Sequence, residues 1–91
     1  MGAAINEKVT AHNGTNSMGT MFIYETFKTG EIVKVNAKSI RVRLESEKRT
    51  VNGEVKSERR INVVATFTFW KNRSDNGKAL YKNAEHGIIT L

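Results

Sequence analysis

The chain has no cysteine and no proline among its 91 residues, and it has no long apolar run. Without cysteine it forms no disulfide and offers no thiolate to a metal, which favours a reducing, cytoplasmic compartment. No segment approaches the roughly 18 consecutive apolar residues of a membrane-spanning helix, and residues 1–19 lack the apolar region of a signal peptide. A chain of this length is expected to form one small soluble domain.

Residues 30–70 are rich in β-forming side chains and predict successive antiparallel strands. Asn52-Gly53 is the strongest turn signal, because a type I′ hairpin turn requires positive φ angles at two consecutive residues. Counting outward from this turn opposes Val51 to Glu54. Farther along, each apolar residue of the first strand then meets an apolar partner: Leu44 and Ile61, Val42 and Val63, Ile40 and Ala65.

The remaining segments complete a mainly β domain spanning residues 20–91. We expect strands over 20–28, 31–36, 39–51 and 54–70. The last of these is too long for one straight strand, so it should bend near residues 63–65 and pair with two neighbours.

The two ends of the chain predict different structures. Residues 79–85 predict a short helix ending at Gly87, and residues 87–91 a closing edge strand. Residues 1–19 contain few large apolar groups, which predicts a flexible arm, or alternatively a tail ordered only against a partner subunit.

The absence of proline removes a common protection of exposed strand edges. Closure of the sheet into a barrel, or pairing between subunits, would cover those edges. The expected fold is therefore a small SH3-like barrel, or a strongly curled antiparallel sheet, with a long projecting hairpin.

One segment carries a resemblance to a known family. The sequence GEIVKVNAKSIRVRL, residues 30–44, resembles the hairpin of small SH3-like β-barrels, including KOW-type modules of transcription and translation proteins. Those modules share a glycine before the first strand, a short polar turn carrying Asn or Lys, and a second β-rich strand. The resemblance implies a binding module for nucleic acid or protein rather than an enzyme.

The chain carries 15 Lys and Arg against 9 Asp and Glu, a formal charge of +6. Such a balance favours contact with phosphates, although it also serves plain solubility. Alternation along the strands turns Arg41 and Arg43 outward from the core. Together with Lys34 and Lys38 they form a first candidate surface for a phosphate backbone, and we expect this surface to lack adjacent acids.

The second candidate surface is the far half of the long hairpin. Residues 45–60 are polar on both faces, so they predict an arm projecting from the core. Its cations could follow phosphates, whereas the alternative is a solvated hairpin held by cross-strand ion pairs such as Glu45 with Arg60. The candidate binding residues of this arm are Lys48, Arg49, Arg59 and Arg60.

Aromatic residues add a third candidate. Phe67 and Phe69 continue the inward series and predict core positions, whereas Trp70 falls on the opposite face. An outward tryptophan beside Lys71 can stack on a base or anchor a protein interface, and the alternative is a structural role at the end of the barrel.

Nothing in the sequence indicates catalysis or a cofactor. His12 and His86 are far apart in the sequence, and no nucleophile–base spacing, metal-ligand cluster or phosphate-binding glycine loop is present. The first hypothesis is therefore a non-catalytic module that binds DNA or RNA. The second is a structural or assembly protein, of a viral or mobile-element type, that oligomerises through its long hairpin and N-terminal arm.

Overall fold

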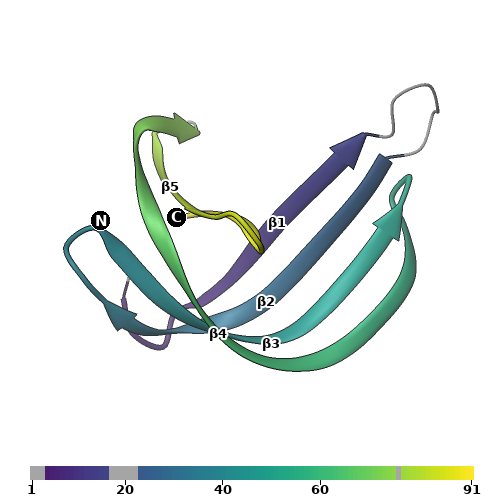
Figure 1. Cartoon of the computed structure of the whole chain (residues 1–91), viewed down its shortest axis with the longest axis horizontal. Coiled ribbons are helices and arrows are strands. Elements are labelled where there is room, and N and C mark those ends of the chain that lie inside the picture. The colour runs from purple at the N-terminus through teal and green to yellow at the C-terminus, as the bar shows by residue number, and fades with distance from the viewer. Residues whose placement is uncertain (1–3, 17–22, 76) are drawn as a thin grey trace.

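The computed structural model describes residues 4–16, 23–75 and 77–91, and within them the chain is all β. The six antiparallel strands are β1 (Lys8–Asn16), β2 (Ile23–Val35), β3 (Ser39–Val51), β4 (Glu54–Asp75), β5 (Lys78–Asn83) and β6 (Gly87–Thr90). They neighbour one another in chain order, and β6 pairs with β1 to close a barrel (Figure 1). The predicted fold class is confirmed in its closed form. The described residues contain no helix long and apolar enough to cross a membrane.

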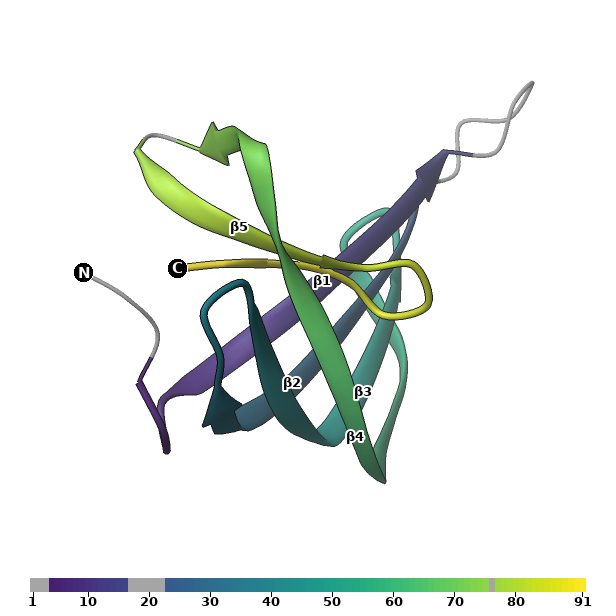
Figure 2. The same cartoon turned by 60° about the vertical axis from the view of Figure 1, so that its left-hand side comes forward.

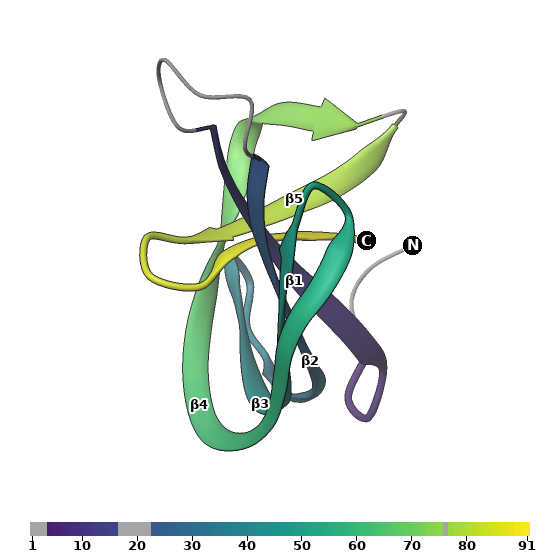
Figure 3. The same ribbon diagram turned by 90° about the vertical axis from the view of Figure 1, so that its right-hand side faces the viewer.

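Strand β4 connects the two parts of the barrel. It pairs with β3 up to Thr68 and with β5 from Thr68 onward, as expected for a strand too long to stay straight. Figure 1 shows it curving from the β3–β4 turn round the barrel to β5. The short β5–β6 hairpin runs across the long strands and fills the gap between β4 and β1 (Figures 2 and 3).

The apolar core lies inside the closed part of the barrel. Inward positions alternate with outward ones along each strand, which gives β3 its sequence of buried Ile40, Val42 and Leu44. The other buried apolar residues of the core cluster are Val9, Ala11, Ile32, Ala65, Phe67 and Ile89. The core position predicted for Phe67 is confirmed.

The predicted core ends too late on β4. Phe69 is 38% exposed and Val63 is 39% exposed, so neither occupies the core position assigned from alternation. They flank the buried Ala65 and Phe67 on β4, and Val63 lies opposite the buried Leu44. Phe69 instead contacts the ring of Tyr81, with the ring centroids 5.6 Å apart.

The Asn52-Gly53 turn and the predicted pair of Val51 with Glu54 are confirmed, but the register predicted farther from the turn is wrong. Asn52 and Gly53 have φ angles of 52° and 83°, as a type I′ turn requires. Two register shifts of one residue each then occur between β3 and β4. The observed partners are Leu44 and Val63, Val42 and Ala65, Ile40 and Phe67. Two shifts of one residue add up to two residues, so each inward residue of β4 stays on the predicted face of the sheet. Its partner on β3 is nevertheless a different residue from the one predicted.

The two strands predicted at 20–28 and 31–36 are a single strand, β2, in the described residues from Ile23. The register shifts at Thr29–Gly30 instead of breaking there. Gly30 has no side chain to obstruct this irregularity, since a Cβ at that position would lie 2.3 Å from the carbonyl oxygen of Arg43. The glycine thus marks a close approach of two strands rather than the end of one.

The predicted helix over 79–85 is also wrong. Residues 78–83 pair with β4 and β6, and a turn follows. Pairing with two strands overrides the modest helix propensity of this segment. Gly87 has a φ of 103°, and a Cβ there would lie 2.3 Å from the carbonyl oxygen of His12. This glycine therefore lets β6 approach β1, while the prediction that the last residues form a closing strand is confirmed.

The predicted N-terminal arm contains the first strand of the barrel. Lys8–Asn16 pairs along its whole length with β2, and Val9 and Ala11 are buried in the core. Small side chains suffice here because the backbone hydrogen bonds of the ladder, rather than a large apolar area, hold the strand. The prediction of a flexible arm is wrong for β1, and residues 1–3 and 17–19 lie outside the described residues.

Replacing Gly30 with alanine tests the close approach of β2 and β3. Because the added Cβ would meet backbone atoms that cannot rotate away, we expect Gly30→Ala to lower the free energy of unfolding by at least about 2 kcal/mol in chemical denaturation. Gly14→Ala is the matched control, since the nearest atom to its Cβ would be 3.5 Å away. Equal stability of the two variants would contradict the described packing.

Candidate nucleic-acid interface

The far half of the β3–β4 hairpin is part of the sheet and not a projecting arm. Residues 46–51 of β3 pair with β4 on one side and with residues 24–29 of β2 on the other. The predicted arm is wrong because sequence alternation could not show that β2 extends alongside it. Lys28, Glu47 and Arg59 occupy one cross-strand row, in line with the buried Ala11 of β1.

Glu47 is the centre of this polar row and is only 4% exposed. Its carboxylate accepts a 2.7 Å hydrogen bond from Arg59 Nε, and Arg49 Nε and Lys28 Nζ lie 3.5 Å and 3.8 Å away. Burial raises the pKa of the Glu47 carboxyl. The Arg59 hydrogen bond and the three positive charges outweigh burial and hold the pKa below its ordinary value of 4.5. Polar side chains thus replace an apolar core in this part of the inner face.

His86 reaches the same cluster from the β5–β6 turn. It is 8% exposed, and its Nδ1 lies 2.7 Å from Lys28 Nζ. Because an ammonium only donates, Nδ1 accepts this bond and the ring is neutral with its proton on Nε2. Burial and the Lys28 charge lower the pKa of His86 below its ordinary 6.5, against weaker opposing effects of Glu85 and Glu47.

Three of the four predicted arm cations thus contact other side chains of the barrel. Arg49 and Arg59 lie against Glu47, and Lys48 Nζ is 5.6 Å from the centroid of the Phe27 ring. Arg60 lies opposite Ser46 and borders a small surface hollow with Glu45. The predicted ion pair between Glu45 and Arg60 is not among those formed.

Glu45 instead pairs with Arg43 of the first candidate surface and with Lys8 of β1. It lies 3.4 Å from Lys8 and 3.9 Å from Arg43, and Glu31 lies at 3.1 Å and 3.9 Å from the same two cations. The expectation that the sheet face lacks adjacent acids is therefore wrong at Arg43. Carboxylates of β2 and β3 reach it because Glu31 is its direct cross-strand partner.

The other three residues of that face differ from Arg43. Lys34, Lys38 and Arg41 are exposed, and in the described part of the chain none of them lies within 4.0 Å of a carboxylate. Lys34 is the cross-strand partner of Arg41. The turn holding Lys38 is joined to β4 by a 2.8 Å hydrogen bond from Phe69 N to the Lys38 carbonyl. These three cations form the basic patch, which adjoins the outer face of β4 through Arg41, the cross-strand partner of Thr66, and through the Lys38 turn.

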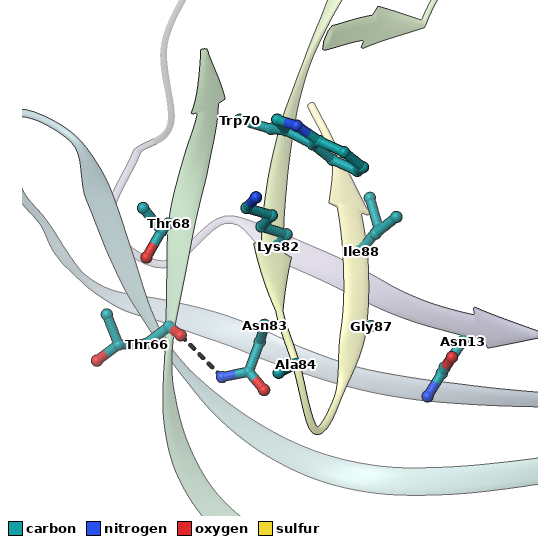
Figure 4. A pocket seen from close by; sticks show the side chains of 9 residues that line it. All are labelled: Asn13, Thr66, Thr68, Trp70, Lys82, Asn83, Ala84, Gly87 and Ile88. Atoms are coloured by element: carbon teal, nitrogen blue, oxygen red, sulfur yellow. Dashed lines mark hydrogen bonds between the residues drawn. The ribbon is translucent and has the colours of Figure 1, made fainter. Parts of the chain in front are cut away.

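The outer face of β4 carries a groove next to the basic patch. It has a volume of about 690 Å³ and is lined by Asn13, Thr66, Thr68, Trp70, Lys82, Asn83, Ala84, Gly87 and Ile88 (Figure 4). Trp70 is partly buried at one end, and Lys82 Nζ lies 4.7 Å from the centroid of its ring. The outward position predicted for Trp70 places it here.

The groove also contains residues that the sequence did not single out. Lys82 lies opposite Thr68 across β4 and β5 and opposite Ile88 across β5 and β6. The predicted helix over 79–85 hid this position, because helical spacing would have turned Lys82 away from β4. A strand assignment with the same alternation as in β4 would have found it.

The described residues do not gather three or more metal-ligating His, Asp or Glu side chains in one place. His12 lies 2.7 Å from Glu25, whereas His86 belongs to the inner cluster. No protein-family model, curated protein or solved structure matches this chain. The function must therefore be inferred from the surface itself.

Removal of the buried charge tests the inner cluster. Glu47→Gln would leave Lys28, Arg49 and Arg59 without their shared carboxylate, so we expect the free energy of unfolding to fall by about 2 kcal/mol, a value reduced for the exposure of both arginines. Glu54→Gln removes an exposed carboxylate that pairs with Lys56, and it should change stability by less than about 0.5 kcal/mol. Urea denaturation of both variants at pH 7 makes the comparison.

The environment of His86 predicts a dependence of stability on pH. Because its pKa is lowered by folding, the unfolded chain binds the proton more tightly, and stability falls as the pH drops below about 6.5. The facing charged groups are Lys28, Glu47 and Glu85. We expect His86→Gln to flatten the pH dependence of unfolding between pH 7 and pH 5. The unaltered protein, measured over the same pH range, is the reference.

Proposed function

We propose that this protein is a non-catalytic nucleic-acid-binding module that contacts phosphates through the basic patch of Lys34, Lys38 and Arg41. The observation that carries the proposal is that these three cations lie together at the end of one hairpin, with no carboxylate beside them in the described residues. Several other Lys and Arg side chains lie against carboxylates, whereas in the described residues the three of the patch have no carboxylate within 4.0 Å. Such cations are available to replace the counterions of a phosphate backbone.

The arrangement of the patch supports a polyanion rather than a small anion. Lys34 and Arg41 lie on adjacent strands and Lys38 lies at the turn between them, so the charges are spread over the end of one hairpin. All three are exposed and none is aimed into an enclosed pocket. A chain of phosphates can contact spread charges one after another. The formal charge of +6 adds a long-range attraction that speeds encounter.

The assembly hypothesis loses its main support in this fold. It depended on a free hairpin and a free N-terminal arm that could add strands to a neighbouring subunit. In the described part of the chain, β1 pairs with both β2 and β6, and β3 pairs with both β2 and β4. Among the described residues, the hairpin edge that keeps a single strand partner is residues 54–67 of β4, which pair with β3 alone.

Charge removal from the patch tests the proposal. We expect the triple variant Lys34→Gln, Lys38→Gln, Arg41→Gln to weaken binding to labelled DNA and RNA oligonucleotides at least tenfold in fluorescence polarisation at low salt. Three lost phosphate contacts should also reduce the slope of log affinity against log salt by about 2 to 3. The reduction follows from the release of fewer counterions.

The matched control removes the same net charge from cations that already have partners. Lys8→Gln, Arg43→Gln, Lys56→Gln should weaken binding by only a few fold, since each of these side chains lies beside a glutamate. Equal loss in the two triple variants would show that net charge, and not the patch, governs binding. Absence of any binding by the unaltered protein at low salt would overturn the proposed function itself.

A further inference from the structure

The groove beside the basic patch combines an aromatic ring with a cation and with polar side chains. Figure 4 shows the Trp70 ring lying across Lys82 and Ile88, above the strands that form the floor. Thr66 and Thr68 project from β4 along one side, and Asn13 of β1 lies at the other. The groove thus offers one apolar surface and several hydrogen-bonding groups, as sites for small planar ligands do.

The floor of the groove is fixed by residues whose polar groups are already used. Asn83 Nδ2 donates a 2.8 Å bond to the Thr66 carbonyl, and Asn83 Oδ1 accepts bonds from the backbone N–H groups of Glu85 and His86. Gly87 permits β6 to lie against β1 beneath it. Asn83 and Gly87 therefore shape the groove, whereas Thr66, Thr68 and Lys82 contribute polar side chains to its lining.

The groove is continuous with the basic patch. Thr66, which lines the groove, is the cross-strand partner of Arg41, and Arg41 is in turn the partner of Lys34. Ser39, the residue after Lys38, is the partner of Thr68. A nucleic-acid backbone lying on the basic patch therefore passes beside the groove. The base of an adjoining nucleotide can then reach Trp70.

From this continuity we infer that the preferred ligand is single-stranded nucleic acid, with one base stacked on Trp70. The inference rests on the proposed function and specifies its ligand. Bases in a duplex are stacked on one another, so their faces are not accessible to an aromatic side chain, whereas every base of a single strand presents one. The groove and the patch together match this combination of planar face and backbone charge.

Lys82 has a defined part in this binding. Its ammonium lies over the Trp70 ring before the base arrives. A cation–π contact at a partly exposed site is weaker than the stacking of a base on an aromatic ring. The base therefore replaces the Lys82 ammonium on the Trp70 ring, and the ammonium forms an ion pair with a neighbouring phosphate.

Trp70 fluorescence provides the test, because Trp70 is the only tryptophan in the chain. The unaltered protein is titrated with homothymidine DNA, homouridine RNA, a DNA duplex of the same length, and an abasic DNA strand with the same number of phosphates. We expect both single strands to quench the fluorescence and to bind at least tenfold more tightly than the duplex and the abasic strand.

Variants separate stacking from charge. Trp70→Leu should reduce affinity for homothymidine at least fivefold and leave the salt slope unchanged, whereas Trp70→Phe, which keeps a ring, should lose less than Trp70→Leu. Lys82→Met keeps the length of the side chain and should lower the salt slope by about 0.7. Circular dichroism checks that each variant is folded. The abasic comparison needs no variant and therefore stands even if a substitution prevents folding.

The outcomes distinguish this inference from the proposed function. Salt-dependent binding that is equal for single strand, duplex and abasic strand, without quenching, would overturn the base-stacking inference and leave the phosphate-binding function standing. Loss of all binding at low salt would overturn both. Quenching by homothymidine that persists in the triple variant of the patch, with unchanged affinity, would overturn the proposed patch while supporting the groove.

Discussion

The fold depends on the closure of the sheet by β6. This strand has four residues, and two pairs of cross-strand partners join it to β1, yet this contact converts a row of strands into a ring. Closure covers part of the strand edge that an open sheet would expose, because Ala11 and His12 of β1 gain partners on β6. It also brings Asn13 of β1 to the groove that Trp70 and Lys82 line. A glycine at position 87 allows this approach because any side chain there would meet the backbone of β1.

The sequence predicted which face of each central strand points inward more reliably than which residues lie opposite one another. Alternation is a local property, so Ile40, Val42 and Leu44 could be assigned to the core from their own strand alone. Pairing is not local. The unpaired Lys56 and a second extra residue of β4 move every later partner, and nothing in the chain near Asn52-Gly53 indicates either irregularity.

The candidate site was partly predictable for the same reason. Lys34, Lys38, Arg41 and Trp70 follow from outward alternation and a basic composition. Arg43 is separated from them by two carboxylates: Glu45, two residues along the same strand, could be read from the sequence, whereas Glu31 of β2 depends on register. The buried environment of Glu47 was also out of reach, since a charged residue in a polar segment gives no local sign that three cations from three strands will surround it. Long-range pairing, rather than residue type, decided which charges remain available.

The β5–β6 turn has two surfaces with different chemistry. On the outside, Asn83 and Gly87 form the floor of the groove, and on the inside His86 accepts a hydrogen bond from Lys28. The Asn83 side chain joins the two, because its carbonyl oxygen holds the backbone N–H of His86. A proton binding to His86 and a ligand entering the groove would therefore both act on the turn backbone that Asn83 holds, at Glu85 and His86. By thermodynamic linkage, if protonation of His86 changes the affinity of the groove for a ligand, then binding of that ligand changes the proton affinity of His86 by the same factor.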